Sequence, residues 1–114
     1  MFSVEERLEL GFPLGRQVLF RNALHRALEA GVDIVSTTLA GYVPGGRAKT
    51  DGPDLEFLRE AVAVAGDTPV FCEGRIHTTA DARAAIDAGA FAIVVGTAIT
   101  HPQSITGWFA EAIG

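Results

Sequence analysis

The stretch that decides the fold is PVFCEGRIHT, residues 69–78, in which a short apolar run ends in the carboxylate of Glu73. Glycine, arginine and histidine follow at once, and a helical pattern begins after Thr78. In parallel α/β proteins the loops at the carboxyl ends of the strands hold the substrate, and a buried strand fixes the direction of a side chain at its end. We therefore expect this strand to present Glu73 to a functional site.

A second apolar run, residues 91–96, ends in Gly96 and Thr97 and carries no carboxylate. Glycine lets a backbone approach a ligand closely, and the loops after the last strands of many barrels bind phosphate through backbone N–H groups. Gly74, Gly96 and Thr97 are therefore candidates for phosphate binding. The plainer alternative is that Gly96 only ends a strand.

Strands and helices alternate along the predicted chain. Apolar residues at 3–4 spacing predict helices, and short β-branched runs predict buried strands. The predicted strands are 32–39, 68–73 and 91–96, and the predicted helices are 20–30, 53–65, 80–88 and about 104–113. This order is typical of βαβ units and a parallel sheet, with the loops 40–52, 74–78 and 97–103 meeting at one edge.

Local signals set the predicted helix ends. Gly31 is expected to end the first helix, and Pro53 suits the first position of the second. Thr78 or Thr79 is expected to cap the third helix. A loop containing Pro102 is expected to lead to the last one.

Three parallel strands, each followed by a helix, make an incomplete fold because the sheet edges are left unpaired. The sequence therefore predicts part of a larger barrel, or a protein that completes its sheet with a partner. We expect the chain to self-associate or to need a preceding half-barrel.

Composition narrows the possible functions. The 114 residues suit one domain, and a net charge of −5 argues against nucleic acid, which requires a basic face. Cys72 is the one cysteine, so the sequence predicts no intrachain disulfide and no cysteine-built metal site. We expect a cytoplasmic protein with no membrane span and no signal peptide.

Three blocks carry a resemblance to a known family: DIVSTTLAGY at 33–42, CEGRIHT at 72–78 and VVGTAIT at 94–100. Residues 20–114 resemble the N-acylglucosamine-6-phosphate 2-epimerases, also called N-acetylmannosamine-6-phosphate 2-epimerases, whose fold is a (β/α)8 TIM barrel. The resemblance implies that these residues form the C-terminal half of such a barrel. Residues 1–19 do not look like the family and are expected to be a divergent N-terminal segment.

The resemblance also implies a function. It implies an isomerase of amino-sugar (sialic acid) catabolism that interconverts N-acylmannosamine 6-phosphate and N-acylglucosamine 6-phosphate by deprotonation and reprotonation at C2. No metal and no organic cofactor is implied. Glu73 matches the family's glutamate, whereas no residue matches the lysine on an early strand with which that glutamate acts. His101 stands where the family usually has a phosphate-contacting arginine.

Other candidate residues lie at the expected strand ends. Arg75 either contacts the substrate, orients Glu73 or forms a scaffold salt bridge. The first strand ends in Thr37 and Thr38; Thr38 and Tyr42 are substrate candidates, and Tyr42 either contacts the sugar or packs as a lid. His77 is expected to bond within its loop, and Trp108 to lie in the core or an interface.

Two alternatives to the epimerase stay open. One is a catalytically inactive half-barrel that at most binds a phosphosugar. The other is a different phosphate-binding barrel enzyme.

Overall fold

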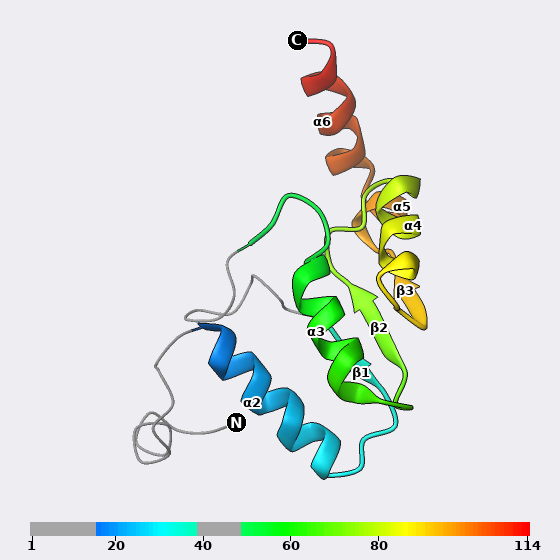
Figure 1. Cartoon of the computed structure of the whole chain (residues 1–114). Helices are drawn as coiled ribbons and strands as arrows, with labels where there is room; N and C mark the ends of the chain where they lie inside the picture. The colour runs from blue at the N-terminus through cyan, green and yellow to red at the C-terminus, as the bar shows by residue number, and fades with distance from the viewer. Residues whose placement is uncertain (1–15, 39–48) are drawn as a thin grey trace.

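The computed structural model describes residues 16–38 and 49–114, and its helices and strands alternate as Figure 1 shows. The elements are α2 (Arg16–Glu29), β1 (Val35–Ser36), α3 (Leu55–Ala65), β2 (Val70–Glu73), α4 (Thr79–Asp87), β3 (Ala92–Val94), α5 (Thr97–Thr100) and α6 (Pro102–Ala112).

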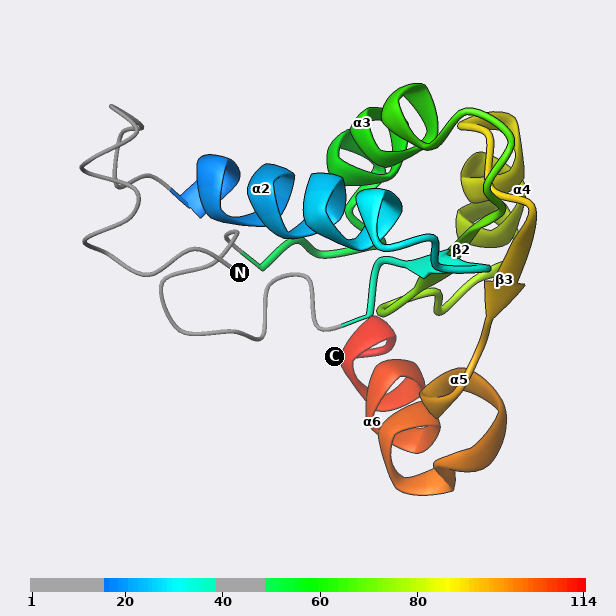
Figure 2. The same ribbon diagram turned by 90° about the horizontal axis from the view of Figure 1, so that it is seen from below.

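The three strands form one parallel sheet in the order β1-β2-β3, which confirms the predicted βαβ architecture. Val35 pairs with Val70, and Glu73 pairs with Val94. Figure 2 shows α2, α3 and α4 on one face of the sheet and α5 and α6 on the other side. The described residues thus form a partial (β/α) barrel.

All three strands are shorter than predicted. The first was expected over 32–39 but pairs only at Val35 and Ser36, and Val32 and Ile34 are exposed. Pro69 stands just before β2 and has no N–H. It therefore cannot donate the backbone hydrogen bond that would continue the ladder between β1 and β2 toward earlier residues.

The ends of α2 and α3 correct two predicted boundaries. Helix α2 begins at Arg16, ahead of the apolar spacing that predicted a start at residue 20. It ends at Glu29, and Gly31, the expected C-cap, follows in the turn with its N–H donating to Leu28 O at 3.0 Å. Helix α3 begins at Leu55, not at Pro53, because the Asp54 carboxylate accepts the Phe57 N–H at 3.1 Å and caps the helix.

Helix α4 has a reciprocal cap. Thr78 accepts the Asp81 N–H at 3.0 Å, and the Asp81 carboxylate accepts the Thr78 N–H at 3.1 Å. This settles the alternative between Thr78 and Thr79 in favour of Thr78.

The predicted loop over 97–103 is wrong. Residues 97–100 form the short helix α5, and Pro102 is the first residue of α6, where its missing N–H costs nothing.

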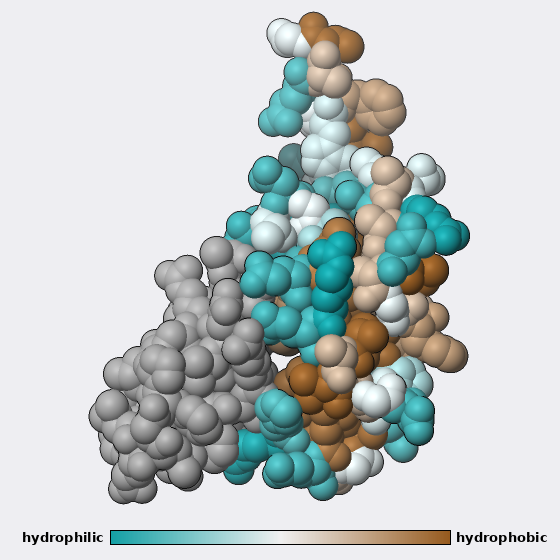
Figure 3. All heavy atoms as spheres, in the orientation of Figure 1, coloured by the Kyte–Doolittle hydropathy of each residue, from teal (hydrophilic) through white to brown (hydrophobic). Residues whose placement is uncertain are grey.

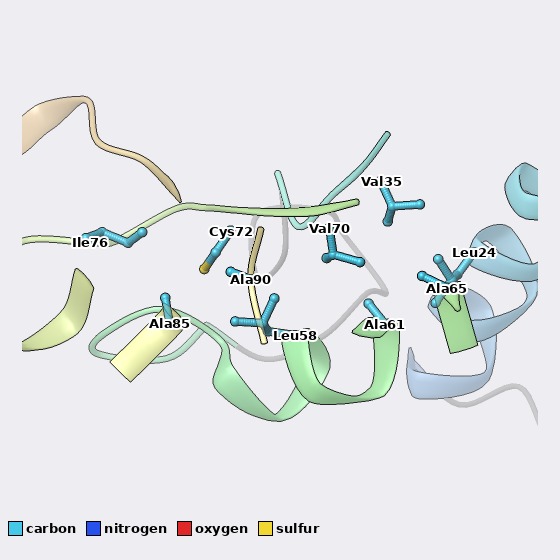
Figure 4. Close-up of a cluster of buried hydrophobic side chains, with 10 residues drawn as sticks. All are labelled: Leu24, Val35, Leu58, Ala61, Ala65, Val70, Cys72, Ile76, Ala85 and Ala90. Atoms are coloured by element: carbon cyan, nitrogen blue, oxygen red, sulfur yellow. The ribbon is translucent and has the colours of Figure 1, made fainter. Parts of the chain in front are cut away.

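The core lies between the sheet and helices α3 and α4, as Figure 4 shows. Leu58 of α3 and Cys72 of β2 are the largest fully buried side chains. Gly89, after α4, lies so close to α3 that a Cβ there would be 2.8 Å from Val62 Cγ1, and its φ is +107°. The absence of a side chain at Gly89 therefore allows this close approach to α3.

Large apolar side chains remain on the surface. Phe91, Ile99, Phe109 and Ile113 are each at least 71% exposed, and α6 contains no buried residue. Figure 3 shows apolar atoms at the free end of α6 and beside the sheet. Among the described residues, no helix is long and apolar enough to cross a membrane.

Candidate active site

A pocket of about 180 Å³ opens where β2 and β3 end. It is lined by Glu73, Gly74, Arg75, Ile76, His77, Val94, Gly96 and Thr97. Five predicted site residues, from two strand ends about twenty positions apart in the sequence, therefore line one pocket.

Glu73 is the last residue of β2. The strand buries Val70 and Cys72 against the helices, so its alternate residues Phe71 and Glu73 face the other side of the sheet and are half-buried. On one side, Glu73 pairs with Val94 of β3. On the other side, the Thr37 hydroxyl accepts the Glu73 N–H and donates to the Glu73 carbonyl, both at 3.0 Å.

The turn after Glu73 is unusual. Gly74 has φ +112° and Arg75 has φ +58°, the only positive φ of a non-glycine residue among those described. A left-handed arginine costs on the order of 1 kcal/mol, so surrounding contacts have to hold it there. Arg75 Nε donates to Gly52 O at 3.1 Å, and Nη2 donates to Thr50 Oγ1 at 3.3 Å. The guanidinium thus joins the loop after β2 to the loop before α3.

Gly96 caps α5 with its carbonyl. That oxygen accepts three hydrogen bonds, from Ile99 N at 2.8 Å, Thr100 N at 3.0 Å and Thr100 Oγ1 at 3.1 Å. The first N–H groups of a helix have no partner within the helix, so this segment offers backbone donors at the pocket wall. Backbone donors of this kind suit an anion.

His77 connects the pocket to the last helix. Its ring lies 4.3 Å from the Trp108 ring, centroid to centroid, with 34° between the planes. The His77 backbone N–H donates to Asp81 Oδ2 at 3.1 Å, so this bond ties His77 to α4 and not, as was predicted, to another residue of its loop.

Two of the predicted site residues, His101 and Thr38, do not line the pocket. The His101 ring caps α6, with Nδ1 accepting the Ser104 N–H at 3.2 Å. Thr38 is exposed and lines a separate hollow between α2 and β1. Tyr42 lies outside the described residues.

The role of Thr37 and the partners of Arg75 were not predicted from the sequence. Thr37 is only 2% exposed, and it is the first-strand hydroxyl that reaches Glu73. Strand periodicity could have indicated this, because Thr37 shares a face with buried Val35 whereas Thr38 does not. The partners of Arg75 at positions 50 and 52 could not be predicted from local patterns.

The described ranges contain no group of three histidine, cysteine or acidic side chains that could hold a metal ion. The ionisable groups of the pocket are Glu73, Arg75 and His77. The chemistry that the pocket can support is therefore proton transfer by a carboxylate beside backbone donors for an anion.

The fold and the pocket together define a partial (β/α) barrel with a carboxylate and a glycine-ended strand at its carboxyl edge. Residues 19–114 match the family described as "Putative N-acetylmannosamine-6-phosphate epimerase" (NanE). The chain belongs to this family, which confirms the resemblance seen in the sequence.

Individual relatives agree. A protein of the same description from Cutibacterium acnes is 60% identical over 88 residues, which cover 76% of this chain and 38% of that protein. One from Clostridium perfringens is 43% identical over 95 residues, covering 81% of this chain and 42% of that protein.

A solved structure of the N-acetylmannosamine-6-phosphate 2-epimerase from Clostridium perfringens superposes with a TM-score of 0.71 at 45% identity. The match covers 76% of this chain and 37% of that one. The chain thus spans about two-fifths of the length of these relatives.

Proposed function

We propose that this chain carries the glutamate and phosphate-binding part of an N-acylmannosamine-6-phosphate 2-epimerase active site. The observation that supports this most directly is that Glu73 and the Gly96–Thr97 backbone line one pocket. Membership of the NanE family indicates the class of substrate, which is a phosphorylated amino sugar.

The reaction requires inversion at C2 of the open-chain sugar. A base removes the C2 proton, the electron pair of that bond moves toward the C1 carbonyl, and an enolate-like intermediate forms. A proton returned on the opposite face gives the epimer. Glu73 is the proposed proton-transferring group, and Gly74, Gly96 and Thr97 are the proposed phosphate contacts. Arg75 is proposed to hold the loop over the sugar.

The family's glutamate acts with a lysine that no residue of this sequence matches. A second candidate function follows from this and from the two-fifths coverage of the relatives: phosphosugar binding without turnover. Either function belongs to amino-sugar catabolism, and a cytoplasmic location is proposed with it.

Exchange at C2 tests the proposal. The purified chain is incubated with N-acetylmannosamine 6-phosphate in heavy water, and the C2 proton signal is followed by NMR. We expect the signal to disappear, and we expect Glu73→Gln to slow the exchange by about 10²–10⁴-fold, the usual contribution of a general acid–base group.

The control is Glu56→Gln, which changes an exposed carboxylate on α3 and should leave exchange unchanged. A folded wild-type chain that binds the sugar phosphate but gives no exchange would support binding alone. No binding and no exchange would reject both functions.

A further inference from the structure

Thr37 is a polar residue buried at the end of β1, with 2% of its surface exposed. Its hydroxyl accepts the Glu73 N–H at 3.0 Å and donates to the Glu73 carbonyl at 3.0 Å. One side chain therefore satisfies both backbone groups of the residue proposed to transfer the proton.

These bonds continue the ladder between β1 and β2. Along β2, the Pro69 carbonyl accepts from Val35 N at 2.9 Å, and the Phe71 carbonyl accepts from Thr37 N at 3.0 Å. The next carbonyl in the series, that of Glu73, accepts from the Thr37 hydroxyl. A side chain of the first strand thus continues the contact to the last residue of β2.

With the hydroxyl in place, Glu73 is held by Thr37 on one side and by its pairing with Val94 on the other. The Glu73 backbone is fixed although β1 ends before it.

We infer that Thr37 is a positioning residue, whose hydroxyl fixes the Glu73 backbone and so directs the Glu73 carboxylate toward the substrate. Thr37 itself touches no substrate. The inference rests on the proposed role of Glu73. Positioning matters for catalysis because a displacement of about 1 Å of a reacting group can cost roughly 10²-fold in rate.

The matched variants are Thr37→Val, which keeps the shape and removes the hydroxyl, and Thr37→Ser, which keeps the hydroxyl. For C2 exchange we expect Thr37→Ser to stay within about threefold of the wild type, and Thr37→Val to lower kcat by about 10–100-fold with KM nearly unchanged. Thermal melting sets an assay temperature at which both variants are folded. A purely structural role would lower the melting temperature of Thr37→Val and leave the kcat of the folded protein unchanged, and that result would overturn the inference.

A second measurement does not depend on turnover. Hydrogen exchange of the backbone amides, read by NMR, should show the Glu73 amide losing its protection in Thr37→Val but keeping it in Thr37→Ser. The Cys72 amide, in the same strand, is the internal control. Equal protection of Glu73 in all three proteins would contradict the inference.

A wild-type chain that shows no C2 exchange would reject the proposed turnover. The amide measurement would then still decide whether Thr37 fixes the Glu73 backbone.

Discussion

Cys72 lies in β2 next to Glu73, and its environment gives a testable pH dependence. Burial raises the pKa of the Cys72 thiol, an effect that a hydrogen bond with Thr37 partly opposes. The folded state therefore keeps the thiol proton at a pH where the unfolded chain has lost it. We expect the free energy of unfolding to fall as the pH rises above the ordinary thiol pKa, by up to about 1.4 kcal/mol per pH unit.

Urea unfolding at a series of pH values between neutral and alkaline measures this slope. The control is Cys72→Ala, which has no thiol to titrate. Its overall stability should be lower, because a buried side chain is truncated, but its alkaline slope should be shallower. Identical slopes in the two proteins would show that the thiol is not the group responsible.

At the scale of the elements, the contact between His77 and Trp108 joins the loop after β2 to α6. Trp108 is the chain's one tryptophan, so its fluorescence reports this contact without interference from another indole. We expect His77→Ala to shift the Trp108 emission to longer wavelength, because the indole loses its packed neighbour, at a stability cost of about 0.5–1.5 kcal/mol. His25→Ala, an exposed histidine on α2, serves as the control and should leave the emission unchanged. An unchanged spectrum in His77→Ala would mean that α6 does not pack on the loop in solution.

The sequence predicted the type and order of the helices and strands more accurately than their first and last residues. The apolar pattern was enough to predict the βαβ order, because the 3–4 spacing of apolar residues in a helix differs strongly from the short continuous apolar run of a buried strand. The boundaries depended on particular side chains: the Asp54 carboxylate moved the start of α3, and Pro69 shortened the ladder of β1. In the site, Glu73 and Gly96 were predictable because each ends an apolar run. The bond from Thr37 was not, because it joins residues that are 36 positions apart.

At the scale of the whole molecule, β3 is an edge strand of the described sheet, and the apolar side chains of Phe91, just before it, and Val94, within it, are exposed. We propose that the chain self-associates through this edge, or that it pairs with a polypeptide carrying the rest of a barrel. Sedimentation should show a mass above the 12.0 kDa of one chain that rises with concentration. Phe91→Lys, just before β3, should lower the association by about tenfold or more, since it removes a large apolar contact and adds a charge.

The matched control is Val64→Lys, which adds the same charge to an exposed apolar position on α3. It should leave the association unchanged. A monomer at every concentration, with a cooperative melt, would contradict the proposal.

The Gly96 carbonyl, held by three donors of α5, has a consequence for ligand binding. In a trans peptide the C=O and the following N–H point in opposite directions, so fixing the Gly96 carbonyl also fixes the direction of the Thr97 N–H. That direction exists only while α5 is folded. For the phosphate contact proposed at Thr97, folding of this one-turn helix and anion binding would be coupled in a single thermodynamic cycle: a bound anion would stabilise the helix by the same free energy with which the folded helix strengthens anion binding.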